Sequence, residues 1–482
     1  MKQVISGISG LDEILGGGFI RPSTMLIAGV TGTGKTTITM QSIFNAAKED
    51  EVCMFITAMS EPIAMINNFM SRFSFYNISL MGKGNVKYVP LDSSLIKNGS
   101  LAIINEIEKN IEQIKPDRIV IDPINVLTCW MNDNEKREFY YDLFTKIKEW
   151  NSLVLITSEL LEDDIWKDEV SYVTDGIIYL SNEKVRDTRV RNLEVLKIRG
   201  QAYQAGKHSY RITNDGLTIY PILQSVEKQL PLNERTTTGI TGLDKMIEGG
   251  LIKGSSTLIS GGSGTGKTIM GLQFAVACAL KGEPVVFVAF EEEPQIIKNN
   301  ALAFGWDIEK FENKGLLKII PCSANHMDLN ENAIAIKNQI EEISAQHVVI
   351  DNINGFRSLV GDVDKLSEHV NVLSKYFRSK NITSIFINEV PELMGSTTIS
   401  GDGTTFILDN IILLRYIEME SEMKKAISVL KMRGSNHDKE IRELVITKKG
   451  IEVKLPFTEY SGLMSGNPVK SASQAFVEAF KK

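Results

Sequence analysis

The segments GVTGTGKTT at residues 29–37 and GGSGTGKTI at residues 261–269 decide the fold of this chain. Both satisfy the phosphate-loop pattern G-x-x-x-x-G-K-[ST], and both stand between an apolar run typical of a strand and a helical pattern. The glycines of such a loop let backbone N–H groups converge on phosphate oxygens at the start of a helix, where the helix dipole also favours negative charge. Two matches in this context predict two nucleoside triphosphate sites.

The sequence on either side of the two loops is also repeated. GISGLDEILGGG begins at residue 7 and GITGLDKMIEGG follows 232 residues later, the same offset that separates the loops. RIVIDPIN and HVVIDNIN are 229 residues apart, and LKIRG and LKMRG are 234 apart. Matched blocks in one order with nearly constant offsets predict a duplicated domain of about 230 residues.

Each repeat alternates helical patterns with short runs that are apolar throughout, such as TMLIAGV and HVVID. Fully apolar runs suit strands buried on both faces, so we predict two tandem α/β domains with central, mostly parallel sheets. The predicted boundaries are residues 1–223 for the first domain, a polar linker at 224–238, the second domain at 239–460, and a C-terminal loop and short helix at 461–482.

Composition narrows the function classes. The chain has 482 residues and a net charge of −7, which disfavours non-specific binding to nucleic acid. It has no run of 18 apolar residues and no signal-peptide pattern at its start, so we expect a cytoplasmic protein without a membrane segment. Four scattered cysteines are expected to be buried free thiols, and the five histidines show no metal-ligand spacing.

The loops and two strand ends supply the expected ligands of ATP and Mg²⁺. Lys35 and Lys267 are expected to reach the β- and γ-phosphates, and the hydroxyls of Thr36 and Thr268 to bind Mg²⁺. Asp122 and Asp351 each end an apolar run, where a carboxylate can hold the metal through water. The expected nucleotide contacts in the loops are Gly32, Thr33, Gly34, Lys35, Thr36 and Thr37, and Gly264, Thr265, Gly266, Lys267, Thr268 and Ile269.

Carboxylates after the second apolar run differ between the repeats. Glu291 and Glu292 follow VVFVAF and can orient a nucleophile for attack on the γ-phosphate, with Glu291 also a candidate metal ligand. The first repeat has Met59 and Ser60 at these positions and keeps only Glu61, opposite Glu293 of the second repeat. The alternative interpretation is a solvated acidic loop. Either way, the two sites are not expected to be equivalent.

Two Lys-x-Arg elements recur late in each repeat. Lys197 with Arg199, and Lys431 with Arg433, stand on predicted strands, where alternate side chains point to the same side. Two such cations, directed at a triphosphate of a neighbouring subunit, would act as arginine fingers do. The alternative is an exposed strand face with ordinary charges.

The chain resembles the KaiC family of circadian-clock ATPases and autokinases over nearly its whole length. The most specific pieces are TGITGLD before the second loop, EEEPQIIKNNALAFGWD at residues 291–307, and the segment at 409–443. RecA, RadA and DnaB share the loop and the Asp-terminated strand but not the last of these pieces. The resemblance implies RecA-like P-loop domains, a homohexamer of two stacked rings, and ATP bound between adjacent subunits.

The resemblance also assigns roles to single positions. Ser71 and Phe304 would lie near the nucleotide base, and Glu291 would be the general base of phosphoryl transfer. The family phosphorylates two adjacent hydroxyl residues before the Asp409 strand, which are Thr405 and Phe406 here, so one acceptor remains, with Thr404 and then Ser400 as fallbacks. Contacts with the neighbour's nucleotide would come from Thr213, Asn214 and Lys425, together with the two Lys-x-Arg elements and their central residues Ile198 and Met432.

The leading hypothesis is an ATPase with serine/threonine autokinase activity that reports its nucleotide and phosphorylation state to clock-type or other signalling partners. A weakly catalytic, ATP-dependent scaffold is the first alternative, and the carboxylates missing from the first repeat favour it. A DNA motor or recombinase is the second, and the acidic net charge disfavours it.

Overall fold

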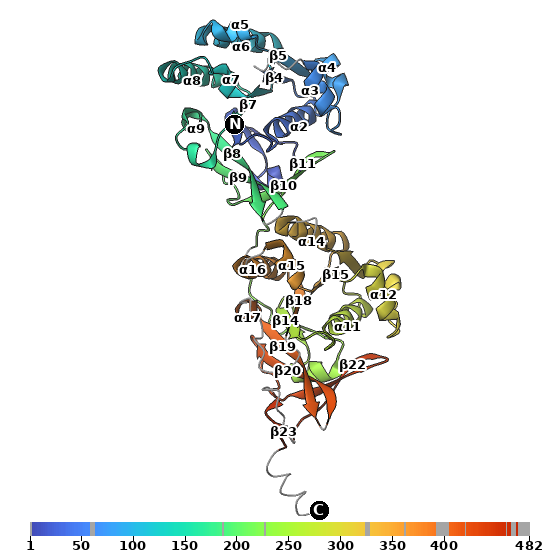
Figure 1. Cartoon of the computed structure of the whole chain (residues 1–482). Coiled ribbons are helices and arrows are strands. Elements are labelled where there is room, and N and C mark those ends of the chain that lie inside the picture. Colours follow the sequence, from blue (N-terminus) through green and yellow to red (C-terminus); the bar gives the residue numbers. More distant parts are fainter. Residues whose placement is uncertain are drawn as a thin grey trace, which may run out of the picture. The chain divides into compact units, whose positions relative to one another are not determined.

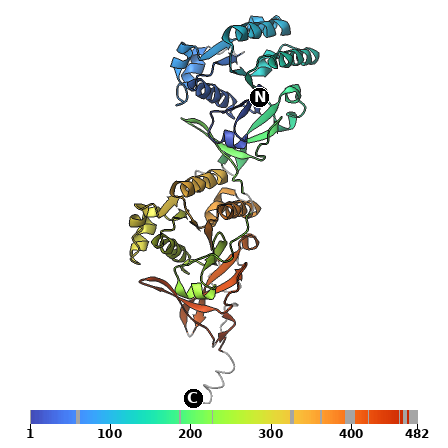
Figure 2. The same cartoon turned by 180° about the vertical axis from the view of Figure 1, so that it is seen from behind.

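The computed structural model describes residues 2–57, 63–185, 188–225, 228–322, 328–360, 363–391, 404–419, 421–458, 460–463 and 469–470. The chain divides into two compact units, Met1–Ile222 and Leu223–Lys482 (Figure 1). Each unit has a central sheet with helices packed on it, as the view from behind also shows (Figure 2).

The first unit is built on a nine-stranded sheet with the order β11-β10-β9-β8-β3-β7-β6-β4-β5. From β5 along the sheet to β4, β6, β7, β3 and β8, neighbouring strands pair in parallel. From β8 onward to β9, β10 and β11, neighbouring strands pair antiparallel. The strands are β3 (Ser23–Gly29), β4 (Cys53–Thr57), β5 (Val86–Pro90), β6 (Arg118–Asp122), β7 (Leu153–Glu159), β8 (Gly176–Val185), β9 (Thr188–Ile198), β10 (His208–Thr213) and β11 (Gly216–Tyr220).

Helices cover both faces of this sheet, which explains why β3, β4 and β6 are almost wholly buried. Alternate residues such as Phe55 pack against α2, and those between them, such as Ile56, pack against α6 and α8. The helices are α1 (Leu11–Ile14), α2 (Lys35–Lys48), α3 (Ile63–Met70), α4 (Ile78–Lys83), α5 (Ser93–Lys97), α6 (Ser100–Ile114), α7 (Ile124–Leu127), α8 (Asp133–Ile147) and α9 (Glu169–Val173).

The second unit repeats this topology, with the sheet order β16-β15-β17-β18-β14-β19-β20-β21-β22. Its strands are β14 (Ser256–Gly261), β15 (Val285–Ala289), β16 (Leu317–Pro321), β17 (His347–Asp351), β18 (Thr383–Glu389), β19 (Asn410–Met419), β20 (Glu422–Met432), β21 (Arg442–Thr447) and β22 (Gly450–Pro456). Its helices are α10 (Thr241–Met246), α11 (Lys267–Leu280), α12 (Pro294–Leu302), α13 (Ile308–Glu312), α14 (Leu329–Ile343), α15 (Asn354–Val360), α16 (Val363–Ser379) and α17 (Thr404–Ile407).

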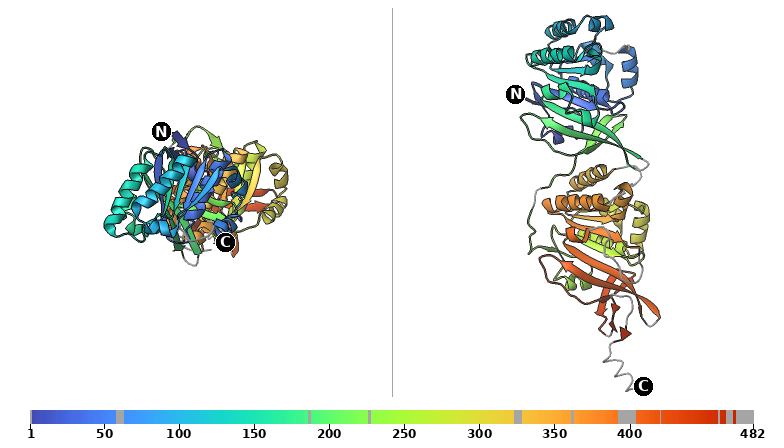
Figure 3. Two further views of the ribbon diagram at one scale, coloured as in Figure 1. Left: turned by 90° about the horizontal axis from the view of Figure 1, so that it is seen from above. Right: turned by 60° about the vertical axis from the view of Figure 1, so that its left-hand side comes forward.

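The matching sheet orders confirm the predicted fold class of two tandem RecA-like α/β domains with mostly parallel sheets. Helices lie beside the strands of each unit in the right-hand view of Figure 3. Short strand pairs lie beside each sheet. In the first unit β1 (Lys2–Val4) pairs with β2 (Phe19–Arg21), and in the second β12 (Arg235–Thr236) pairs with β13 (Leu251–Ile252). Because β12 lies inside the segment assigned to the linker, residues 235 and 236 join the fold of the second unit.

Two further observations concern the sequence predictions. None of the helices that the structure describes combines the length and the apolar character needed to span a bilayer.

Cys53, Cys278 and Cys322 are buried free thiols, but Cys129 is exposed, so the expectation of buried thiols is wrong for Cys129. It follows the one-turn helix α7, at the surface of the first unit. The predicted C-terminal helix lies in residues 471–482, outside the described part of the chain.

Candidate functional site

Each phosphate loop leads from a buried strand directly into a long helix. In the second unit, α11 begins at Lys267, and its N-cap Gly266 has a φ of 108°, a left-handed conformation that favours glycine. No side chain caps this N-terminus within the described chain, so its first N–H groups face the loop. The first unit repeats the arrangement at Gly34, with a φ of 94°, and Lys35. Both helix starts therefore offer backbone donors and a lysine to phosphate.

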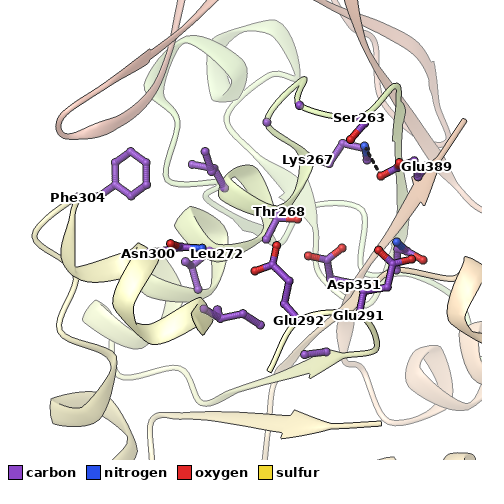
Figure 4. A pocket seen from close by; sticks show the side chains of 16 residues that line it. Ser263, Lys267, Thr268, Leu272, Glu291, Glu292, Asn300, Phe304, Asp351 and Glu389 are labelled. Carbon is purple, nitrogen blue, oxygen red and sulfur yellow. Dashed lines mark hydrogen bonds and ion pairs between the residues drawn. The ribbon is translucent and has the colours of Figure 1, made fainter. Parts of the chain in front are cut away.

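A cavity of about 400 Å³ surrounds the start of α11 (Figure 4). That volume lies within the range of small-ligand pockets. Most of the predicted second-unit loop residues line it, whereas Thr265 is buried and its hydroxyl donates to the Gly262 carbonyl at 2.8 Å. The lining residues are Ser263, Gly264, Gly266, Lys267, Thr268, Ile269, Leu272, Ala289, Glu291, Glu292, Ile297, Asn300, Phe304, Asp351, Asn352 and Glu389.

Oxygen donors gather on one wall of this cavity. Asp351, at the end of β17, accepts a hydrogen bond from the Thr268 hydroxyl in the first turn of α11. The pKa of Asp351 is raised to about 6, chiefly by burial. The hydrogen bond from Thr268 opposes this rise, and the nearby carboxylates of Glu292 and Glu291 add to it. Carboxylate and hydroxyl oxygens are the ligands that Mg²⁺ prefers. These side chains could thus hold Mg²⁺ between the protein and a triphosphate.

The first unit has a related but distinct arrangement. Asp122 at the end of β6 accepts hydrogen bonds from Thr157 on β7 and from Thr36 in the first turn of α2. Burial raises the pKa of Asp122, and these hydroxyls together with Lys35 oppose the rise. Met59, Ser60 and Glu61 lie outside the described residues. The predicted difference between the carboxylates of the two sites therefore stays a prediction.

A glutamate that the sequence interpretation missed faces each phosphate-loop lysine. Glu389, at the end of β18, forms an ion pair with Lys267 Nζ at 3.3 Å, and the same lysine donates to the Gly262 carbonyl at 2.9 Å. Glu159, at the end of β7, lies 3.9 Å from Lys35 Nζ and accepts from Thr31 at 3.0 Å. The signal was available in the sequence, because LVLITSE and SIFINE place a glutamate at matched ends of two apolar runs.

The two residues expected near the base each come after the helix that follows a matched strand, β4 in the first unit and β15 in the second. Phe304 follows α12, lines the cavity at the end opposite Glu389, and stacks on Trp306 with ring centroids 4.9 Å apart (Figure 4). Ser71 follows α3, and its hydroxyl donates to the Asn68 carbonyl at 2.9 Å. The aromatic face of Phe304 is suited to stacking against a base.

The Lys-x-Arg elements contact a neighbouring segment of their own chain instead of the cavity. Lys197 Nζ donates to the Thr174 carbonyl at 2.6 Å, and Arg199 lies 3.5 Å from Asp175. Lys431 Nζ donates to the carbonyls of Leu408 at 2.6 Å and Thr405 at 3.0 Å. Within the described chain, Lys431, Met432 and Arg433 are not among the residues that line the cavity.

The predicted acceptor therefore shares a surface with the second Lys-x-Arg element. Thr405 lies in α17, and Arg433 donates to the Phe406 carbonyl at 3.1 Å. Phe406, at the second acceptor position of the family, is 81% exposed. The structure thus brings Lys431, Arg433 and Thr405 together on a surface outside their own chain's cavity. The side chain of Thr404 lies outside the described residues, as does Ser400.

The remaining predicted contacts lie on strands or in the segments that join them. Thr213 ends β10, and the Asn214 carbonyl accepts from the Ser74 amide at 2.8 Å. The Lys425 ammonium lies 5.7 Å from the ring centre of Tyr416, whose hydroxyl donates to the Gly264 carbonyl at 2.8 Å. Ile198 and Met432 are the last residues of β9 and β20. Lys425 is thereby linked to the phosphate loop of its own chain.

Comparison with known proteins agrees with this geometry. The family model for the KaiC ATPase matches the chain twice, at residues 4–224 and 236–456. This chain belongs to the KaiC family. It is 31% identical to the circadian clock oscillator protein KaiC of Thermosynechococcus vestitus over 98% of this chain and 92% of that protein. It is 32% identical to the protein of the same name from Synechococcus elongatus, over 96% and 91% of the two chains.

A third relative, KaiC of Prochlorococcus marinus subsp. pastoris, is 31% identical over 100% of this chain and 96% of its own. The family resemblance predicted from the sequence is confirmed. The chain is accordingly a KaiC-like ATP-binding protein with two ATPase domains.

Proposed function

We propose that this KaiC-family chain forms a homohexameric ring, hydrolyses ATP with Mg²⁺, phosphorylates its own Thr405, and signals its state to partner proteins. The observation that carries the catalytic part is the second-unit cavity, where Lys267, Thr268, Glu291 and Asp351 share one wall (Figure 4). Mg²⁺, when bound at these oxygens, neutralises charge on the β- and γ-phosphates. Lys267 would leave Glu389 to bind the same phosphates.

Phosphoryl transfer needs an oxygen held in line with the γ-phosphate and a group to accept its proton. Thr405 Oγ1 attacks the γ-phosphorus, the bond from that phosphorus to the β–γ bridging oxygen breaks, and ADP leaves. Glu291 accepts the hydroxyl proton. The same carboxylate can orient water for hydrolysis.

The acceptor and the cavity belong to different subunits in this proposal. Lys431 and Arg433 hold the backbone of α17 and lie outside their own chain's cavity, which favours action on a neighbour's nucleotide. The exposed ring of Phe406 is a second reason, because an aromatic side chain that is 81% exposed gains stability when a neighbouring subunit buries it. A net charge of −7 favours protein partners over nucleic acid, and we place the protein in the cytoplasm.

Intact-mass spectrometry of the full chain after incubation with Mg-ATP tests the kinase. We expect one added phosphate, mapped to Thr405, which is lost in Thr405→Ala and reduced in Glu291→Gln. Thr404→Ala and Ser400→Ala are matched controls that should retain it. A spectrum without added phosphate after hours rejects the kinase and leaves the ATPase.

Light scattering after size-exclusion chromatography tests the ring. A ligand that binds only the assembled state stabilises that state by mass action, so Mg-ATP should shift the chain to a hexamer. Arg433→Ala and Lys431→Ala should weaken this shift. A monomer at micromolar concentration in Mg-ATP contradicts the proposal.

A further inference from the structure

Three metal-binding side chains converge in the second unit, at the end of β17 opposite Asp351. Cys278 lies in the last turn of α11, Glu283 lies just before β15, and His347 is the first residue of β17. One ligand atom from each lies within 4.8 Å of the others. Cys278 and His347 are buried, and His347 Nε2 is 2.9 Å from Glu283 Oε2.

The first unit shows what the same place holds without these ligands. Helices α2 and α11 have equal length and both begin at a phosphate-loop lysine, so Cys278 corresponds to Ala46. Strands β6 and β17 align RIVID with HVVID, so His347 corresponds to Arg118, and Glu283 corresponds to Glu51. Arg118 is 1% exposed and lies 3.3 Å from Glu51. A permanent cation balances the glutamate there.

The second unit has no arginine at this place, pairs Glu283 with Lys253 instead, and gains two potential ligands. Exchanging Arg118 for His347 replaces a guanidinium, which cannot bind metal, with an imidazole, and exchanging Ala46 for Cys278 adds a thiol beside it. The glutamate that both units keep then completes a nitrogen, sulfur and oxygen set. Packing alone accounts for a smaller side chain, His347, in place of Arg118. It gives no reason why both new side chains, His347 and Cys278, are of a kind that binds metal.

The geometry leaves room for one ion. Lys253 Nζ engages Glu283 Oε1 at 3.3 Å, which leaves Oε2 directed at His347. The Thr236 hydroxyl lies 3.4 Å from Oε2 and 3.8 Å from Cys278 Sγ, so this oxygen lies beside the three ligand atoms, where a fourth ligand is needed. Zn²⁺ takes sulfur, nitrogen and oxygen ligands at about 2.0–2.3 Å in tetrahedral geometry, which small side-chain rotations achieve here.

We propose that Cys278, Glu283 and His347 bind one Zn²⁺ ion, a structural site distinct from the two ATP sites. Binding releases the thiol proton of Cys278 to water and joins a thiolate, a carboxylate and a neutral imidazole to the metal. The ion would replace the role of Arg118 by tying the end of α11 to the start of β17. Because α11 begins at Lys267 and β17 ends at Asp351, the site would brace the two elements that carry the phosphate and metal ligands.

Metal titration of the full chain tests the site. The chain is stripped with a chelator, exchanged into buffer free of ATP and Mg²⁺, and titrated with Zn²⁺ against a chromophoric competitor. Co²⁺ serves as a spectroscopic probe, because thiolate ligation adds a charge-transfer band that oxygen ligands of the ATP sites cannot give. We expect one tight Zn²⁺ per chain and a Co²⁺ spectrum with the thiolate band.

Cys278→Ala restores the residue of the first unit. This variant should lose the thiolate band and weaken Zn²⁺ binding by at least about 100-fold, which exceeds the effect of losing a residue that only hydrogen-bonds to a metal ligand. Cys129→Ser is the matched control, because this exposed thiol lies in the first unit and should leave both readings unchanged. ATP binding by each variant verifies that it folds. The melting temperature of the unsubstituted chain should also rise when Zn²⁺ is added and fall when a chelator is added.

Absence of stoichiometric Zn²⁺ binding overturns the proposal. So does binding that Cys278→Ala leaves unchanged, or a Co²⁺ complex without the thiolate band. If Cys278→Ala does not fold, the Co²⁺ spectrum and the melting shift of the unsubstituted chain decide alone.

Discussion

The two units share one scaffold and differ in the groups around the strand that ends in an aspartate, β6 in the first unit and β17 in the second. Asp122 of the first unit is held by hydroxyls of Thr36 and Thr157, whereas the second unit has Ile387 at the position of Thr157. Asp351 accepts from Thr268 alone among hydroxyl side chains of the described residues, and the carboxylates of Glu291 and Glu292 lie near it. The aspartate of the first unit therefore has one more hydroxyl partner, and that of the second has two additional carboxylates nearby.

Part of a duplicated ATP site follows from the fold alone. The loop, its lysine, the aspartate and the glutamate beside the lysine occur in both units, because each stands at the end of a sheet strand or at the start of the helix after the loop. The carboxylates that would act on the γ-phosphate stand in a connection after the strand, where substitutions leave the sheet intact. Binding is thus expected in both units and catalysis mainly in the second.

The largest expected effect comes from removing the second-unit carboxylates. Glu291→Gln with Glu292→Gln should lower ATP turnover by about 10²–10⁴-fold, since a general base contributes that much. Steady-state phosphate release measures it, and nucleotide binding serves as the control. Glu61→Gln in the first unit should change turnover little. If Glu61→Gln abolishes turnover and the double variant retains it, the alignment of the first site is wrong.

Lysine removal should affect the two units alike. Lys35→Ala and Lys267→Ala each remove charge-assisted hydrogen bonds to phosphate, so each should weaken ATP binding at its own site by roughly 10- to 100-fold. Equilibrium binding of labelled ATP should fall from two tight sites per chain to one in either variant. Lys281→Ala, at the far end of α11, is the matched control. Retention of both tight sites in Lys267→Ala would contradict the role of the loop.

The glutamates beside these lysines should have a smaller and unequal effect. Glu389 competes with phosphate for Lys267, so Glu389→Gln should tighten ATP binding by about two- to five-fold, the scale of a partly exposed ion pair. Glu159→Gln should do less, because Glu159 is more exposed and 3.9 Å from Lys35. Isothermal titration compares both with Glu342→Gln, a surface ion pair of the second unit. Weaker ATP binding in Glu389→Gln would assign Glu389 to the nucleotide contact instead.

The sequence predicted the parts of this protein that depend on local pattern. Phosphate loops, apolar strands and their duplication are readable along the chain, and they determined the fold class that the sheets confirm. Glu159 and Glu389 escaped notice because their importance depends on strand order. Strand β18 pairs with β14, although the two are far apart in the sequence. This pairing brings Glu389, at the end of β18, to Lys267.

Spacing along the chain does not report on side chains that meet from separate elements. The five histidines show no metal-ligand spacing, yet His347 meets Cys278 and Glu283 from two other elements. The contacts of Lys431 with α17 likewise depend on the pairing of β19 with β20, which no local pattern specifies.

A buried histidine gives the smallest test of the comparison between the units. His369 in α16 occupies the place of Phe139 in α8, and both are buried in equivalent cores. Its ring packs edge-on against Phe356 with centroids 4.7 Å apart. Burial lowers the pKa of His369 to about 4, below the 6.5 of an unfolded histidine. The unfolded chain therefore binds a proton more readily than the folded one.

The stability associated with His369 is therefore complete above pH 6.5 and falls as the pH drops from 6.5 toward 4. Between pH 7.5 and pH 6 this group should cost the second unit about 0.8 kcal/mol of unfolding free energy, and His369→Phe should remove that loss. Calorimetry at both pH values, on the variant and the unsubstituted chain, isolates the effect as a double difference. A variant that loses as much stability on acidification as the unsubstituted chain would show that His369 is not the group that titrates, because Phe at this position, as in the first unit, binds no proton.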